Sequence, residues 1–149
     1  EDEKYMLDLA ASFYCKPEVS LFINEWNVEG KVILEAIIPE GKDKPYYAKG
    51  EDDKWWVYIR VKDKSLLASK IVVDVLKNHT EQKDTLIEYG PKEKGLIDFL
   101  SRNERITLKE FCRLVNISKR RASKILITMI SAGIIRSHNT EKIEFYTLA

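Results

Sequence analysis

The stretch that most constrains how this chain folds runs from Leu108 to Gly133 and reads LKEFCRLVNISKRRASKILITMISAG. It predicts a short helix, a turn at residues 115–117, and a longer helix that begins after Ser118, because a serine side chain can accept a hydrogen bond from a free amide of the first helical turn. Counted from this cap, apolar residues recur at the i, i+3, i+4, i+7, i+8 spacing of one buried helix face. They are Ala122, Ile125, Leu126, Met129 and Ile130. The stretch therefore predicts two helices joined by a tight turn, and Gly133 is placed to end the second helix.

Polar and basic side chains follow the cap directly and fall largely outside the buried face. Lys119, Arg120 and Arg121 are the first three residues of the helix, and Ser123 and Lys124 lie in its second turn. Cations at this end of a helix are repelled by the positive end of the helix dipole, so the arrangement is unfavourable for the isolated helix. A phosphate partner offsets that cost. The cluster therefore indicates a face that binds a polyanion, and the alternative interpretation is an ordinary solvated helix face.

The charge of the chain is distributed unevenly. The 149 residues carry a formal net charge of only +1, which by itself favours no polyanionic partner. Residues 1–78 hold 12 basic and 15 acidic side chains, whereas residues 79–149 hold 13 and 9. Residues 102–136 hold 9 basic and 2 acidic side chains. Positive charge is therefore concentrated around the helix pair, as a phosphate-binding face requires.

The cysteine content and the apolar runs bear on the compartment. Cys15 and Cys112 are far apart in the sequence and belong to no paired-cysteine motif, so we expect reduced thiols in a cytosolic protein. The apolar runs are far shorter than the roughly 20 residues needed to span a bilayer. No charged-then-apolar signal segment opens the chain. We therefore expect a cytoplasmic protein that is not inserted in a membrane.

No recognisable catalytic or metal-binding motif occurs in the sequence. The six glycines are scattered, and phosphate-loop, nucleophile-elbow and zinc-spaced motifs are missing. His79 and His138 have no nearby carboxylate or thiol cluster, so we expect no metal site. The acidic loop residues 51–53 are expected to be plain solvated charge. We therefore expect no enzymatic activity and no cofactor.

The first half of the chain predicts a small sheet with helices. The expected elements are helices over 2–14 and 65–77, a hairpin of strands over 19–26 and 31–38, a loop over 41–54, and a strand over 55–61. The inward face of the first helix is expected to carry Met6, Leu9, Ala10 and Phe13. The strand WWVYIRV alternates between two faces, and its aromatic residues either pack on the sheet, which we favour, or stack on nucleic-acid bases.

The second half is set off by a polar stretch over residues 79–91, which ends in Gly90-Pro91 and predicts a linker. A helix over 91–102 and a short extended segment at Ile106 precede the helix pair. Two strands over 134–137 and 143–148, joined by a turn at 138–142, follow it. The order of these elements is that of a winged helix.

The final 58 or so residues resemble a winged helix-turn-helix domain of bacterial transcription regulators. The resemblance is carried by ITLKEFCRLVNISKRRASKILITMISAGII and by the closing segment IRSHNTEKIEFYTL. It implies that the start of the third helix enters the major groove and that the hairpin, or wing, contacts the DNA backbone or minor groove. The implied DNA-binding residues are Ser118, Lys119, Arg120, Arg121, Ser123, Lys124, His138, Asn139 and Lys142, with supporting phosphate contacts from Arg102, Arg105, Lys109 and Arg113.

Residues 1–77 resemble the C-terminal half of the Schlafen-type Alba-like domain, a domain of bacterial regulators assigned to DNA binding and also labelled ATP-binding or divergent AAA. The resemblance is carried by DEKYMLDLAASFYCKPEV, VILEAIIPEGKDKPYYAK and WWVYIRV. The matching motif residues are Lys44, Pro45, Tyr47, Tyr58 and Arg60. The upstream half of that family, with its Asn-Thr-x-Gly-Gly element, has no counterpart here, which suggests that the chain is a fragment of a longer protein.

Together these features predict an α+β fold, with a small mixed sheet and helices followed by a winged helix. The expected organisation is a partial Schlafen-type domain over 1–78, a linker over 79–91, and a DNA-binding domain over 92–149. The expected function is transcriptional regulation through duplex DNA by a homodimer. The N-terminal domain is expected to act as an oligomerisation or effector module, with its sheet as the candidate dimer contact. The alternatives are an ATP-binding or nuclease-type protein whose catalytic half lies upstream, and a winged helix that binds another protein.

Overall fold

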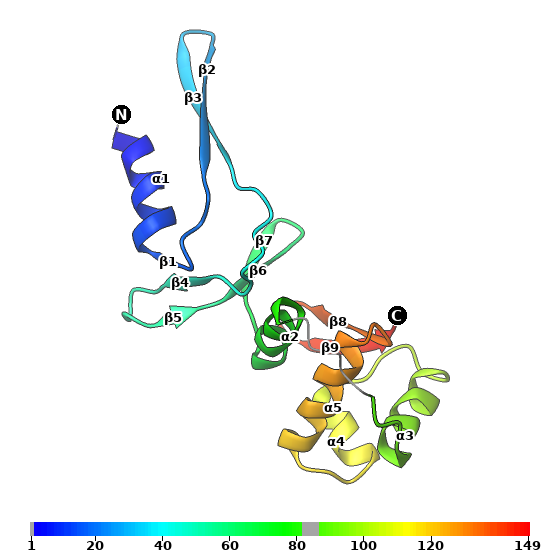
Figure 1. Ribbon diagram of the computed structural model, residues 1–149. Helices are drawn as coiled ribbons and strands as arrows, with labels where there is room; N and C mark the ends of the chain where they lie inside the picture. Colours follow the sequence, from blue (N-terminus) through cyan, green and yellow to red (C-terminus); the bar gives the residue numbers. More distant parts are fainter. Residues whose placement is uncertain (1, 82–86) are drawn as a thin grey trace. The chain divides into compact units, whose positions relative to one another are not determined.

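The protein is described by a computed structural model over residues 2–81 and 87–149. It has the predicted α+β fold, with helices and small antiparallel sheets (Figure 1). The chain divides into two compact units, unit 1 over Glu1–Tyr58 and unit 2 over Ile59–Ala149. No helix in the described ranges is long and apolar enough to cross a membrane.

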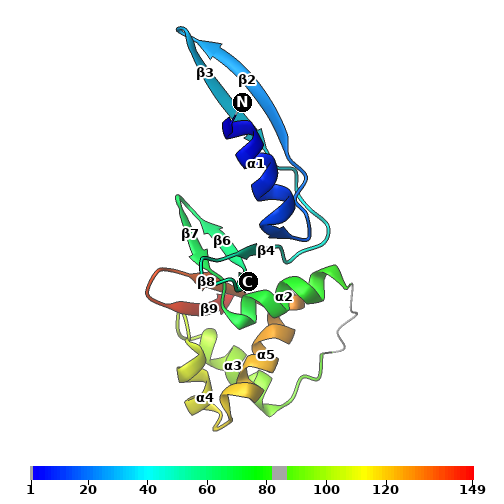
Figure 2. The same cartoon turned by 90° about the vertical axis from the view of Figure 1, so that its left-hand side faces the viewer.

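Unit 1 holds one helix and two separate small sheets. Its elements are α1 (Asp2–Phe13), β1 (Cys15–Lys16), β2 (Phe22–Val28), β3 (Lys31–Ile37), β4 (Tyr47–Lys49) and β5 (Trp55–Trp56). The order of the first sheet is β1-β4-β5, and its strand pairs are antiparallel. β2 and β3 form a ribbon of their own, visible as the long hairpin in Figures 1 and 2.

The β2–β3 hairpin confirms the strand pair expected from the sequence, although β2 begins at Phe22 and continues to Val28. Only Glu29 and Gly30 remain for the loop, with φ angles of 52° and 78°. Positive φ at both positions of a two-residue loop matches the right-handed twist of the flanking strands. The turn therefore fixes the register, which pairs Val28 with Lys31 at the loop end and Phe22 with Ile37 at the other.

The inward face predicted for α1 is wrong at three of its four residues, since only Leu9 among them is half-buried. Met6 and Phe13 are 60% and 68% exposed and Ala10 is exposed as well, whereas Leu7 and Leu9 are half-buried. Apolar spacing locates the stripe of a helix but not the surface that covers it. In the described part of the chain little covers α1, and none of its residues is buried.

The strand expected over 55–61 is divided in the structure. β5 ends at Trp56 and β6 (Tyr58–Val61) pairs with β7 (Lys64–Leu67) instead of with the β4 sheet. Val57, where the chain passes from one sheet to the other, is buried. The predicted alternation holds, since Trp56, Tyr58 and Arg60 are exposed and the residues between them are not. Another departure is β4, which lies inside the predicted loop.

Unit 2 is organised around a single apolar core. Its further elements are α2 (Lys70–Thr80), α3 (Pro91–Leu100), α4 (Leu108–Leu114), α5 (Lys119–Ser131), β8 (Ile135–Asn139) and β9 (Glu144–Leu148). Ile106 makes the predicted short extended segment, an antiparallel bridge to Tyr146. The fully buried core residues come from all of these segments except α2 and include Leu96, Ile106, Phe111, Leu126, Met129, Ile135 and Tyr146. In Figures 1 and 2, α5 lies between α2 and α4.

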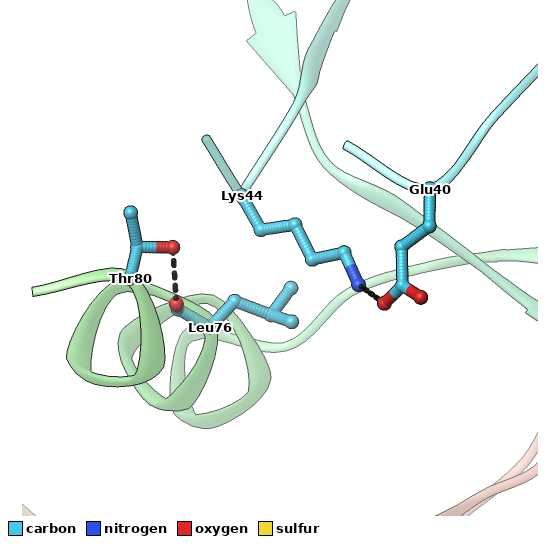
Figure 3. A network of polar contacts seen from close by, with 4 residues as sticks. All are labelled: Glu40, Lys44, Leu76 and Thr80. Atoms are coloured by element: carbon cyan, nitrogen blue, oxygen red, sulfur yellow. Dashed lines mark hydrogen bonds and ion pairs between the residues drawn. The ribbon is translucent and has the colours of Figure 1, made fainter. Parts of the chain in front are cut away.

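The helix predicted over 65–77 differs from the observed α2 in its start and in its surroundings. Residues 64–67 form β7, and Ser69 caps α2 by accepting a hydrogen bond from the Val72 amide at 3.3 Å. At the other end, Thr80 donates to the Leu76 carbonyl (Figure 3). Ile71 is 5% exposed and belongs to the core that contains α5. The compact units accordingly divide at Tyr58 and Ile59, whereas the sequence placed the boundary in the polar stretch 79–91, of which residues 82–86 lie outside the described part.

Candidate nucleic-acid interface

The helix pair begins with a strongly capped α4. Thr107 Oγ1 accepts a hydrogen bond from the Glu110 amide at 3.3 Å, and the Glu110 carboxylate accepts from the Thr107 amide at 2.7 Å and from its hydroxyl at 2.9 Å. Two otherwise unpaired amides are thus satisfied reciprocally. Asn116, with φ of 51°, reverses the chain after α4, a conformation that asparagine tolerates better than most residues. The predicted turn at 115–117 is confirmed.

The predicted cap and buried face of α5 are confirmed as well. Ser118 Oγ accepts from the Arg121 amide at 3.3 Å. Ala122, Leu126 and Met129 are fully buried and Ile125 is nearly so, whereas Ile130, the last residue predicted for this face, is half-buried. Gly133 follows the helix with φ of 71°, which glycine adopts without the steric cost of a side chain. The buried stripe anchors α5 on the core and sets which side chains face outward.

The outward side chains form what we call the basic ridge, consisting of Lys119, Arg120, Arg121 and Lys124. All four are exposed, and Ser123 between them is half-buried. Across residues 2–81 and 87–149, none of these four side chains makes an ion pair or hydrogen bond. The ridge therefore presents positive charge that the described residues do not neutralise by direct contact.

Two hollows border the ridge, and each contains acidic side chains. One, of about 570 Å³, lies between α2 and α5 and is lined by Lys70 and Asp74 together with Lys119 and Arg120. The other, of about 470 Å³, is lined by the following residues, which include two acids: Glu88, Glu93, Arg121, Lys124, Ile125, Thr128 and Met129. The Glu93 carboxylate has a partner of its own, because it accepts a hydrogen bond from the Gly90 amide at 3.0 Å.

Local sequence patterns could not have found these bordering residues. Asp74 is 46 positions from Arg120 in the sequence, and only the packing of α2 on α5 brings the two helices together. In the sequence, the apolar residues Ile71 and Val75 indicate that one face of α2 is buried, but they do not indicate that α5 covers it. Placing them required the tertiary structure.

The hairpin predicted to be the wing is formed by β8 and β9, and we keep the name wing for it. β8 extends two residues further than predicted, to Asn139, whereas β9 begins one residue later, at Glu144. His138 and Asn139 pair with Phe145 and Glu144, so they lie in β8 and not in the turn. The His138 ring stacks on Phe145 with centroids 5.0 Å apart, and its Nε2 lies 2.9 Å from Thr147 Oγ1. These contacts hold the imidazole on the strand, although the residue stays exposed and Asn139 is half-buried.

The turn of the wing is held by hydrogen bonds within the turn and by polar contacts with β7 and with the residue that caps α2. Thr140 Oγ1 accepts from the Ile143 amide at 3.0 Å, which closes the turn and leaves Lys142 exposed at its tip. Glu141 pairs with Lys64 of β7 at 2.7 Å, and Glu144 accepts from the Ser69 hydroxyl at 2.9 Å. The wing is therefore held from the side by β7 and the start of α2.

The predicted supporting cations are all exposed. They are Arg102, Arg105, Lys109 and Arg113. The Arg105 guanidinium lies 5.2 Å from the Phe145 ring centroid, within the range of a cation–π contact. Arg105 is thereby directed toward the wing, whereas Arg113 ends α4.

The motif residues of the N-terminal half differ in exposure and in their contacts. Lys44 pairs with Glu40 (Figure 3), Pro45 is buried, and Tyr47 begins β4 half-buried. Tyr58 and Arg60 are exposed, and Arg60 donates to Ser65 Oγ at 3.2 Å. Each of these contacts is local to its own unit.

Other kinds of site find no support in the described ranges. They contain no group of three or more histidine, cysteine or acidic side chains placed to hold a metal ion. Cys15 and Cys112 are free thiols, each half-buried.

No family model, curated protein or solved structure matches this chain. The candidate site is therefore argued from its geometry alone.

The α4 cap makes the stability of unit 2 depend on pH. Hydrogen bonds from the Thr107 amide and hydroxyl hold the pKa of Glu110 below its usual value. A carboxyl with a lower pKa in the folded state contributes stability above its unfolded pKa, and this is lost as the pH falls through the folded pKa. We expect Glu110→Gln to lower the free energy of unfolding at pH 7 and to lower it less as the acid range is entered. Chemical denaturation of both proteins between pH 7 and pH 3 measures the difference, and a constant difference would contradict this role of the carboxylate.

Proposed function

We propose that this protein is a DNA-binding transcriptional regulator that inserts the start of α5 into the major groove of duplex DNA. The observation that carries the proposal is the basic ridge: four exposed cations without ion-pair partners among the described residues, on the first two turns of a helix anchored by a buried stripe. The order of α3, the Ile106 bridge, α4, α5 and the β8–β9 hairpin supports it, because this is the order of a winged helix.

The proposed mechanism divides the cations by position. Successive helix residues are about 100° apart, so Arg120 and Arg121 flank an arc with Lys124 inside it, on the side away from the buried stripe. That arc can reach base edges, where arginine and lysine bond to guanine O6 and N7. Cations around the arc would neutralise phosphates and position the helix. These are Arg102, Arg105, Lys109, Arg113 and Lys142.

The proposal includes two copies of the chain on two half-sites, a cytoplasmic bacterial protein, and no catalytic or cofactor chemistry of its own. A palindromic operator would then mirror the two-fold symmetry of the dimer. A second candidate is a winged helix that binds another protein. Asp74, Glu88 and Glu93 beside the ridge favour it, because a surface of alternating charge suits a protein partner better than a polyanion.

Salt dependence separates the two candidates. Each phosphate neutralised by the protein contributes about −0.9 to the slope of log K against log salt concentration. A random duplex offers no specific base readout, so on it each of the four cations of the basic ridge can neutralise a phosphate, which gives a slope of about −3.6, and contacts from the surrounding cations make it steeper. We expect fluorescence anisotropy with a labelled random duplex between 50 and 300 mM salt to show this slope. Undetectable binding at 50 mM salt would reject the regulator and favour the protein-binding alternative.

A further inference from the structure

The β2–β3 ribbon has features that intramolecular contacts leave unexplained. It is a sheet of two strands, and within the described residues neither outer edge is paired. A two-stranded hairpin is at best marginally stable in water, and an unpaired edge is a template for another strand. Pro45 and Val57 are the only buried residues of unit 1 among those described. The ribbon therefore lacks the neighbours that normally stabilise such a hairpin.

One face of the ribbon carries exposed apolar side chains beside the polar Asn24, Lys31 and Glu35. Phe22, Trp26, Ile33 and Ile37 lie on it and are 44% to 60% exposed. The opposite face carries Glu25, which lies 3.7 Å from Lys4 of α1, so α1 approaches the ribbon from that side. A further strand at an open edge would place side chains beside these residues on the same face.

The register of the hairpin identifies which backbone groups of β3 point outward. Val28 and Lys31 close a two-residue loop, so they form a hydrogen-bonded pair, and such pairs alternate along an antiparallel ribbon. The amides and carbonyls of residues 31, 33, 35 and 37 are therefore directed to β2. Those of Val32, Leu34 and Ala36 point to the open edge, where a further strand could bond to them.

We propose that β3 pairs antiparallel with β3 of a second copy of this chain, about a two-fold axis at Ile33. Val32 and Leu34 then bond to Leu34 and Val32 of the second copy, and Ile33 faces its own counterpart. Lys31 lies directly opposite Glu35 of the second copy, and the symmetry makes this ion pair twice. The two paired hairpins form a four-stranded sheet, and a sheet of three or more strands can be stable on its own.

The charge on the strand supports this register. Glu35 Oε2 accepts hydrogen bonds from Trp26 Nε1 at 2.9 Å and from Asn24 Nδ2 at 3.2 Å, while its Oε1 can accept from a lysine of another chain. These two hydrogen bonds also lower the pKa of Glu35, which keeps the carboxylate charged for such a pairing. Opposite charges directly across two strands are stabilising.

The other open edge does not fit a second copy equally well. The backbone groups of residues 23, 25 and 27 point outward from β2. Residues 22–28 contain no lysine or arginine, so no register of two β2 strands provides an ion pair, and an axis at Glu25 places Glu25 opposite Glu25. Like charges directly across an antiparallel pair are destabilising. Glu25 is also close to Lys4, whose contact such pairing would disturb. The ribbon is therefore expected to self-associate through β3.

Charge reversal at the proposed pair provides the first test. This inference rests on the dimer included in the proposed function. Dimerisation is measured in the absence of DNA, so a failure to dimerise can be distinguished from a failure to bind DNA. By sedimentation velocity of the full chain from 1 to 100 µM, we expect a dimer whose dissociation constant rises at least about tenfold in Lys31→Glu. The exchange Lys31→Glu with Glu35→Lys restores both ion pairs and should recover most of the loss. The matched control Lys42→Glu should have no effect.

A disulfide provides the second test, independent of affinity. At a non-hydrogen-bonded pair the two Cα atoms are about 4.5 Å apart, which a disulfide can bridge. In a background with Cys15 and Cys112 replaced by serine, oxidised Ile33→Cys should form a covalent dimer. Ile37→Cys is the control on the same strand and face, because the proposed register separates the two copies of residue 37 by roughly 26 Å.

Three outcomes would overturn the inference. A monomer up to 100 µM excludes the dimer itself. A dimer insensitive to Lys31→Glu, or equal cross-linking at positions 33 and 37, places the contact elsewhere on the chain. Circular dichroism of each variant establishes that the fold is retained, and if Glu35→Lys disturbs the hairpin, the Ile33→Cys result decides alone.

Discussion

Replacing Arg120, Arg121 and Lys124 together with alanine is expected to weaken binding to duplex DNA by at least about 100-fold, because contacts of this kind to base edges are worth about 1–3 kcal/mol each. The three side chains are exposed and make no ion pair or hydrogen bond among the described residues. The thermal midpoint of unfolding should therefore change little. Fluorescence anisotropy at fixed salt measures the loss of affinity, and a salt titration of the variant should show a shallower slope.

The matched control removes the same charge elsewhere. Lys42, Lys77 and Lys94 are exposed and do not line either hollow beside the basic ridge. Their joint replacement with alanine lowers the net charge by three as well, so any general electrostatic effect is equal. We expect only a few-fold loss of affinity in this control. Equal losses in the two triple variants would show that DNA is bound by overall charge, without a specific contribution from α5.

The second large effect is expected in the core of unit 2. Phe111 is fully buried on α4, where it contacts the cluster that supports α5. Phe111→Ala should lower the free energy of unfolding by about 3–5 kcal/mol, the usual cost of removing a buried phenylalanine. Urea denaturation followed by circular dichroism measures this directly. Since α5 rests on the same core, the variant should also lose DNA binding at temperatures where the native protein binds.

Leu114 is the matched position for this prediction, because it lies on the same helix and is 44% exposed. Leu114→Ala should cost less than about 1 kcal/mol, since little apolar surface is returned to water. A comparable loss for both variants would mean that α4 does not pack as the structure shows. A loss at Leu114 alone would indicate that its exposed side chain is covered by a partner in solution.

The residues of the helix pair were predictable because their interactions are local. The cap at Ser118 and the glycine at 133 act within one or two turns of their own helix. The buried stripe of α5 follows from its spacing in the same way. The basic ridge could therefore be read from the sequence residue by residue, together with its exposure.

The errors of the sequence interpretation lie where the outcome depended on distant contacts. Position 57 marks a change of sheet that the alternating strand pattern does not show. His138 and Asn139 belong to β8 because β9 pairs with them, whereas the turn residues alone suggested a longer loop. The apolar residues of α1 are spaced as for a covered face, yet Met6 and Phe13 are exposed in the described structure.

The sequence by itself determined the α+β class, the capped helix pair, the hairpin and the identity of the exposed cations, because caps, turns and periodicity act between residues close together in the chain. Only the tertiary structure decided that α2 packs beside α5 and that Asp74, Glu88 and Glu93 border the basic ridge. It also showed that β2 and β3 stand apart from the other strands. The physical reason is that apolar burial is non-directional, so a stripe of apolar residues specifies that it will be covered but not by which part of the chain.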